Sequence, residues 1–228
     1  MALIWRSALL VTLAVLLSTP AQAAFDASDA TERLLAAPPV GFEDTVALSG
    51  LEQPTAVRFA PDGRIFVAEK AGRIQVFDDF GDPTPTLYAD LSRQVHDFWD
   101  RGLLGMELDP GFATGRPYVY VLYAYDKDPN SPAFPRWGDE CPSPPGAMED
   151  GCVVTGRLSR LSGGFEQVLI EDWCQQYSSH SLGSLAFGAD GALYVSAGEG
   201  ANYNIADWGQ DGIPRNPCGD PPAVVGGA

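Results

Sequence analysis

Residues 184–197 read SLAFGADGALYVSA, and residues 56–69 repeat their layout as AVRFAPDGRIFVAE. In both stretches an alternating apolar and polar segment ends at a phenylalanine, and an Asp-Gly pair follows three residues later. A second alternating segment starts just after the glycine. Asp-Gly suits a tight hairpin turn, because glycine adopts positive φ without a steric penalty. Both stretches are therefore predicted to be β-hairpins of one repeated unit.

A third copy of this unit, with a longer turn, occupies residues 105–123 and reads GMELDPGFATGRPYVYVLY. In chain order, the first two copies start 49 residues apart and the last two start 79 residues apart. The excess of 30 residues is close to the length of the Pro- and Cys-rich stretch 127–152, which is interpreted as a loop insertion. A repeat of about 50 residues with four short strands is typical of β-propeller blades. A β-sandwich with similar hairpins is the alternative.

Short alternating segments separated by Gly, Pro, Asp and Asn fill most of the chain, which predicts the all-β class and favours a β-propeller. One short helix is expected at residues 26–37, where Asp29 and Glu32 have capping-box spacing. A propeller closes with four or more blades, and this sequence holds about three, so we expect a fragment of a longer protein. The expected strands are 44–50, 55–60, 64–70, 73–78, 86–92, 103–109, 118–126, 157–162, 166–172, 181–188 and 192–198.

The start of the chain has the parts of a secretory signal peptide: Arg6, the apolar run 8–17 and the small residues Ala21-Gln22-Ala23. Cleavage near Ala23 predicts a secreted or periplasmic protein. The apolar run is too short to span the ~30 Å hydrocarbon core of a membrane, and no later run is long enough. The predicted organisation is a signal peptide at 1–23, an N-terminal segment at 24–43 and a partial propeller domain at 44–228.

The charge of the chain argues against several classes of partner. The 30 acidic and 14 basic residues give a formal net charge of −16. Loss of Arg6 with the signal peptide leaves 13 basic residues and a charge of −17. Such a surface repels phosphate groups, and no basic cluster offsets the repulsion. We therefore do not expect nucleic acid or an anionic membrane as a partner.

Four cysteines, an even number in an exported chain, suggest two disulfides with three possible pairings. We favour Cys141 with Cys152, which closes the loop CPSPPGAMEDGC, and by default Cys174 with Cys218. A zinc site is the alternative. The chain has no Cys-x-x-Cys pair, and neither of its two histidines has metal-ligand spacing to a cysteine.

Three stretches in chain order resemble the soluble quinoprotein glucose/sorbosone dehydrogenases. They are GLEQPTAVRFAPDGRIFVAEKAGRIQVF (50–77), DRGLLGMELDPGFATGRPYVYVLYAYD (100–126) and SHSLGSLAFGADGALYVSAGEG (179–200). The resemblance implies a six-bladed propeller that holds pyrroloquinoline quinone (PQQ) and calcium at one end of its channel. It also implies that a histidine takes the proton of an aldose's anomeric hydroxyl, that a lactone forms, and that electrons pass to an external acceptor. Relatives include hedgehog-interacting-type propellers, which are not known chiefly as enzymes.

The catalytic histidine of that family falls on His180 of this sequence. An imidazole with an ordinary pKa of roughly 6.5 is largely neutral at neutral pH, so it can act as a base. The simpler interpretation of His180 is a loop residue that hydrogen-bonds to the backbone. Asp100 stands where the family's enzymes often carry glutamine, and it could orient the imidazole, act as a ligand or pair with Arg101. Glu199 could face the channel, or it could be a carboxylate at the end of a hairpin.

Three other features are predicted to have no catalytic role. His96, in the stretch RQVHDFWD, is predicted to be a solvated residue between blades, with a loop residue near the channel mouth as the alternative. The tyrosines of 118–125 are predicted to pack on the sheet and not to serve as a sugar platform. Residues 126–130 begin like a calcium-binding loop but lack its later glycine and glutamate, so no metal ligands are assigned.

We therefore predict an exported oxidoreductase that oxidises an aldose sugar to a lactone, with His180 as general base. The alternative is a non-catalytic propeller that binds carbohydrate or protein. It is favoured by Asp100 and by Ser179, which replaces the acidic residue usual in the family. Most PQQ and calcium contacts of the family come from later blades, so the chain alone is expected to be inactive. The sugar, the acceptor and the oligomeric state are left unassigned.

Overall fold

The structure is a computed structural model that describes residues 38–202, 217 and 218. Two compact units, Met1–Thr45 and Val46–Ala228, divide the chain, and every described strand belongs to the second. The described part of the first unit contains one turn, in which the Phe42 N–H donates to the Pro39 carbonyl. The predicted signal peptide and the helix predicted at 26–37 lie outside the described residues.

The first sheet contains four antiparallel strands in the order β1-β2-β3-β4. The tight turn predicted for the first hairpin is confirmed: Phe59 pairs with Ile65, and the N–H of Gly63, at φ 99°, donates to the Ala60 carbonyl at 3.0 Å. The hairpin joins the first two strands of the sheet. The four strands are β1 (Pro54–Phe59), β2 (Ile65–Glu69), β3 (Arg73–Phe77) and β4 (Thr86–Asp90).

The strand predicted at 44–50 is wrong, because these residues form no strand pairing in the structure. Leu48 instead packs, with Leu51, against the buried side chains of Ile65, Val67 and Phe77. The alternation of the sequence therefore reflects an irregular segment that covers one face of the first sheet.

The second sheet is also antiparallel, in the order β5-β6-β7-β8, and its first two strands are the second hairpin copy. The long turn of that hairpin contains a short 3-10 helix, Phe112–Thr114. The predicted insertion lies between the second and third strands and contains one helical turn, Gly146–Asp150. The strands are β5 (Leu103–Leu108), β6 (Val119–Tyr125), β7 (Val154–Ser162) and β8 (Phe165–Gln175).

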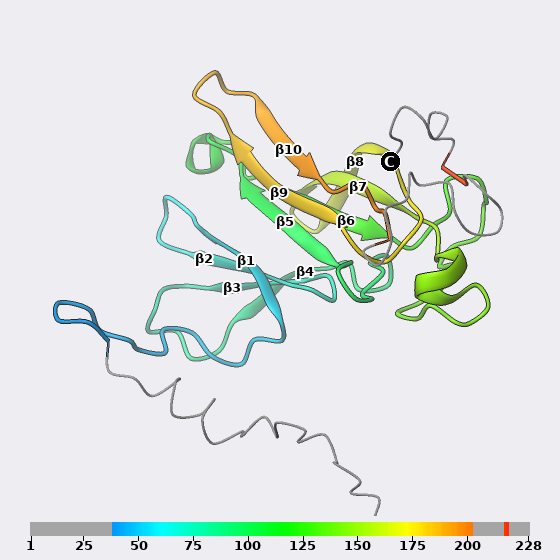
Figure 1. Cartoon of the computed structure of the whole chain (residues 1–228). Coiled ribbons are helices and arrows are strands. Elements are labelled where there is room, and N and C mark those ends of the chain that lie inside the picture. The colour runs from blue at the N-terminus through cyan, green and yellow to red at the C-terminus, as the bar shows by residue number, and fades with distance from the viewer. Residues whose placement is uncertain (1–37, 203–216, 219–228) are drawn as a thin grey trace, which may run out of the picture. The chain divides into compact units, whose positions relative to one another are not determined.

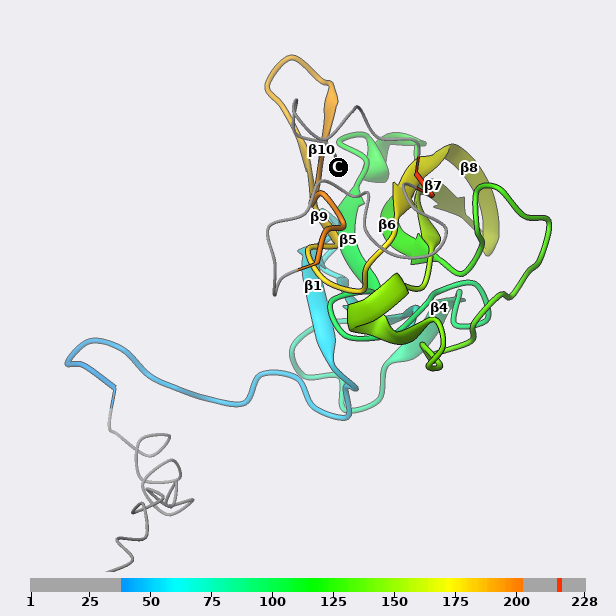
Figure 2. The same ribbon diagram turned by 45° about the vertical axis from the view of Figure 1, so that its right-hand side comes forward.

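The third sheet, within the described residues, is the last hairpin copy: β9 (Leu182–Phe187) paired with β10 (Leu193–Ala197). The strands β1, β5 and β9 contact one another in that order, so the three sheets lie side by side (Figures 1 and 2). Each sheet begins with one hairpin copy, which is the radial repetition of a β-propeller. The described chain is thus all-β and comprises two complete blades and the inner hairpin of a third.

The blades are held together by apolar side chains between their sheets. The larger core joins the first two blades and contains Phe66, Ile74 and Met106, all fully buried. A smaller core joins the second and third blades around Leu122 and Leu185. Within the described residues no helix has the length and apolar character needed to cross a membrane.

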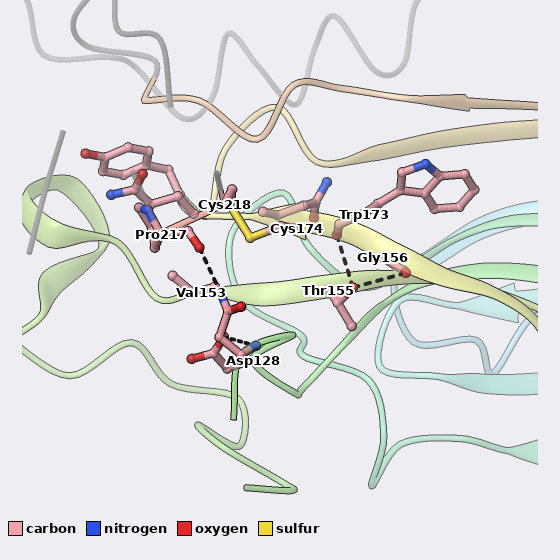
Figure 3. Close-up of a disulfide and its surroundings, with 12 residues drawn as sticks. Asp128, Val153, Thr155, Gly156, Trp173, Cys174, Pro217 and Cys218 are labelled. Atoms are coloured by element: carbon pink, nitrogen blue, oxygen red, sulfur yellow. Dashed lines mark hydrogen bonds between the residues drawn. A yellow bond between two sulfur atoms is a disulfide. The ribbon is translucent and has the colours of Figure 1, made fainter. Parts of the chain in front are cut away.

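Two disulfides brace the second blade, and they have the pairing favoured from the sequence. Cys141 is bonded to Cys152 across the insertion, and Cys174 in β8 is bonded to Cys218. Figure 3 shows the second bond at the end of β8. Near it the side-chain amide of Asn130, from the insertion, donates to the Pro217 carbonyl at 2.9 Å. The described cysteines therefore contain no free thiol.

Candidate functional site

A cavity of about 540 Å³ lies where two loops meet, and its described lining consists of Trp99, Asp100, Ser179 and His180. One loop joins β4 to β5, and the other joins β8 to β9. Both loops therefore precede the first strand of a blade. Because first strands of neighbouring blades lie side by side, their preceding loops meet at one end of the molecule.

The backbone is strained at two of the residues that line this cavity. Trp99 has φ 52° and His180 has φ 49°, in the left-handed region that non-glycine residues rarely adopt. Such a conformation costs about 1–3 kcal/mol and persists only where the surroundings impose it. Here the surroundings are visible: Asp100 N–H donates to the Ser178 carbonyl at 3.1 Å, and the Asp100 carboxylate accepts the His180 N–H at 3.2 Å.

The imidazole of His180 is paired with the carboxylate of Glu199 through Nδ1. Each of these side chains is 45% exposed, so the pair lies at the protein surface and not in the core, and of the two His180 lines the cavity. A carboxylate acceptor keeps the proton on Nδ1, which leaves the lone pair of Nε2 as the basic site. The arrangement can accept a proton at Nε2 and stabilise the resulting imidazolium.

The structure thus brings together three of the four residues singled out from the sequence: His180, Glu199 and Asp100. Asp100 holds the backbone of His180, while Glu199 contacts its ring. One role considered for Asp100 was an ion pair with Arg101. No such pair is found among the ion pairs of the described residues. Arg101 is completely buried and is not part of the described cavity lining.

Trp99 was missed as a site residue by the sequence analysis. Its indole is 44% exposed and stacks on Phe98, with ring centroids 5.6 Å apart and planes at 11°. Phe98 stacks in turn on His96, at 6.0 Å and 22°. The run of aromatic residues just before Asp100 is the signal that could have indicated this part of the cavity.

The sequence predicted that His96 is a solvated residue between blades, and this prediction is wrong. The His96 side chain is fully buried. The inserted loop covers it: His96 Nε2 donates to the Glu140 carbonyl at 3.0 Å, and the neighbouring Asp97 N–H donates to Asp139. Burial, and after it the charge of Arg101, lower the His96 pKa to about 4. The ring is therefore neutral, and its Nδ1 accepts a hydrogen bond from Arg101.

The pKa of His96 predicts a loss of stability in acid. The unfolded chain takes up a proton near pH 6.5, whereas the folded chain resists protonation until about pH 4. Because the unfolded state binds more protons in this window, the unfolding free energy should fall by about 3 kcal/mol as the pH drops through it. Urea unfolding at pH 7, 5.5 and 4 measures the loss, and His96→Gln should remove this part of it. The same pH dependence in both proteins would contradict the assignment.

The described lining of the cavity does not by itself fit PQQ, which carries several carboxylates. It offers an imidazole, a carboxylate, a hydroxyl and an indole, but no cation. The guanidinium of Arg101 lies beneath and is bonded to His96 and to backbone carbonyls. No group of three or more His, Cys, Asp or Glu side chains among the described residues could hold a metal ion.

Comparison with known proteins gives matches over the blades and the site. The family model of the glucose/sorbosone dehydrogenases matches residues 51–212, well over half of the chain. Hedgehog-interacting protein from Mus musculus is 25% identical over 159 residues, which cover 67% of this chain and 21% of the mouse protein. The chain therefore spans about a fifth of that relative.

Two solved structures are also similar to this chain over part of its length. The PQQ-bound aldose sugar dehydrogenase of Streptomyces coelicolor matches with a TM-score of 0.51 and 20% identity, over 71% of this chain and 42% of its own. A putative glucose dehydrogenase of Thermus thermophilus is 28% identical with a TM-score of 0.47, over 68% of this chain and 39% of its own. The first likeness supports the β-propeller fold.

Proposed function

The chain belongs to the glucose/sorbosone dehydrogenase family, and from this premise we propose that it is the part of a quinoprotein sugar dehydrogenase that supplies the catalytic base. The observation that carries the proposal is that His180, which lines the cavity, is paired with the carboxylate of Glu199. Nε2 of His180 accepts the proton of the anomeric hydroxyl of an aldose. Loss of that proton would let the hydrogen on the anomeric carbon leave as hydride to a bound quinone, which would turn the sugar into a lactone.

The neighbours of His180 have distinct roles in this proposal. Glu199 fixes the imidazole by accepting from Nδ1 and stabilises the positive charge that develops when Nε2 is protonated. Asp100 holds the backbone of His180 and so sets where the ring projects. PQQ, when bound, supplies the two-electron acceptor for the hydride. Its contacts, and those of calcium, belong in the proposal to residues beyond the four that line the cavity.

The proposed setting is the periplasm or the exterior of the cell. Two disulfides within the described chain support an oxidising compartment. In the proposed organisation, residues 1–23 are a cleaved signal peptide, 24–43 a short N-terminal segment and 44–228 the partial propeller domain. The partners are a small sugar and an external electron acceptor.

A reconstitution assay tests the proposed function. The complete protein is supplied with PQQ and calcium, and a panel of aldoses is offered with a redox dye. We expect aldose-dependent dye reduction and a lactone detectable by NMR. The matched control is the methyl glycoside of the best aldose, which lacks an anomeric hydroxyl and should give no turnover.

A second candidate function is favoured by the match to Hedgehog-interacting protein: a propeller that binds a carbohydrate or a protein without redox chemistry. The same assay separates the two. Absence of dye reduction and of the quinone's absorption after reconstitution would overturn the dehydrogenase proposal and leave the binding module.

A further inference from the structure

We propose that Arg101 is a positioning residue, whose buried guanidinium fixes the loop that carries His180. The inference rests on the proposed role of His180 as base. Arg101 is 0% exposed and lies next to Asp100, under the loops that line the cavity. It makes no direct contact with the cavity lining in the described hydrogen bonds, so its action on the site is indirect.

The guanidinium joins three segments that are distant in sequence. One terminal nitrogen donates to His96 Nδ1 at 3.2 Å and to the Cys152 carbonyl. The other donates to the carbonyls of Gln175 and Tyr177 at 2.9 and 2.7 Å. These acceptors belong to the loop before β5, the disulfide-closed insertion and the end of β8. One side chain therefore sets the distances between all three.

The fork of donors and the charge are both needed for this arrangement. Arg101 has no carboxylate among its described hydrogen-bond partners, so neutral acceptors receive its hydrogen bonds. Burial lowers its pKa to about 9, against the opposing charge of Asp126, and this value still leaves it protonated at neutral pH. A lysine presents three donors from one point and cannot reach four acceptors on a planar fork.

The restraint passes to His180 over a few bonds. Arg101 holds the Tyr177 carbonyl, and the adjacent Asp100 N–H holds the Ser178 carbonyl at 3.1 Å. The Asp100 carboxylate then accepts the His180 N–H. Asp100 and Arg101 thus hold the 177–180 segment at Tyr177, Ser178 and His180. Together with the Gly200 N–H, which donates to the His180 carbonyl at 2.9 Å, these bonds hold the left-handed backbone of His180, which an unrestrained loop would relax.

Hydrogen exchange measures this restraint without any need for activity. In the complete protein, Arg101→Met is expected to raise the amide exchange of a peptide covering 176–182 at least tenfold, and Arg101→Lys to raise it less. The control is Arg157→Met: Arg157 is also buried, and it bonds to Glu171 and Tyr123 on the second blade and to Gln94 near the start of the loop before β5, but to no residue of 176–182 among its described bonds. Its loss should leave exchange in 176–182 unchanged.

Kinetics give the second readout. We expect Arg101→Lys to lower kcat for the aldose at least tenfold, with KM changed less than threefold, because the base is displaced while the sugar contacts remain. If Arg101→Met does not fold, Arg101→Lys decides alone. Exchange like the unsubstituted protein in Arg101→Lys, or an equal rise in Arg157→Met, would overturn the proposal. If the complete protein oxidises no sugar, the proposed function fails, whereas the exchange result still tests the restraint.

Discussion

Replacing His180 with alanine is expected to lower kcat for aldose oxidation by about 100-fold or more, since a positioned general base contributes about that much. Alanine removes the only imidazole among the described residues that line the cavity. The anomeric hydroxyl would then have to lose its proton to water. KM should change much less than kcat, because the imidazole acts mainly on the proton that is transferred in the transition state.

The substitution also alters the backbone, and a second variant separates the two effects. His180 has φ 49°, a conformation that alanine tolerates poorly and asparagine adopts more readily. His180→Asn therefore keeps the left-handed turn while removing the base. We expect the two variants to lose activity to a similar extent. Near-normal turnover by His180→Asn would refute the role of His180, whereas a loss confined to His180→Ala would point to the backbone instead.

Glu199 gives a graded comparison within the same site. Glu199→Gln keeps a hydrogen-bond acceptor for Nδ1 but removes the negative charge that stabilises the protonated ring. Its loss of kcat should therefore be smaller than that of His180→Ala. A larger loss in Glu199→Gln would assign the proton transfer to the carboxylate rather than to the imidazole.

The hairpins of this fold were predictable because their cause is local. An Asp-Gly pair between two alternating segments sets a tight turn through the residues themselves, and Gly63 and Gly191 both have the positive φ that such turns require. The alternation at 44–50 was misleading for the opposite reason. It predicts one buried face, which Leu48 provides, but it does not show whether a partner strand is available.

The sequence singled out three residues that the structure brings together, but it did not reveal their geometry. His180, Asp100 and Glu199 were singled out by their places in stretches that resemble the dehydrogenase family, yet their separation in sequence does not reveal which carboxylate contacts the ring. The strained backbone of His180 is imposed by tertiary hydrogen bonds, so no local sequence pattern predicts it. His96 was predicted wrongly because its burial depends on residues 139 and 140 of the insertion. Contacts across long loops are what single-sequence reasoning misses.

Removing the Cys174–Cys218 disulfide is expected to lower the unfolding free energy by about 4 kcal/mol, and removing Cys141–Cys152 by about 3 kcal/mol. The bonds close loops of 44 and 11 residues. In the chain-entropy treatment, a disulfide that closes a longer loop restricts the unfolded chain more. Removing that disulfide therefore stabilises the unfolded state more. The double variants C174S/C218S and C141S/C152S, compared by urea unfolding, measure the difference without leaving a free thiol.

Both disulfides also lie close in sequence to backbone carbonyls that accept hydrogen bonds from Arg101. The comparison of the two double variants therefore also bears on the site. Cys152 itself supplies one carbonyl, and Cys174 precedes Gln175, which supplies another. The shorter loop contains Glu149 and Asp150 but not Glu140, which covers His96 from just outside it. If loop entropy alone decides stability, C174S/C218S is the less stable variant. The reverse order would show that native contacts around Cys152, which is fully buried, outweigh the loop length. In that case the buried guanidinium and the insertion would form one stabilising unit beneath the base.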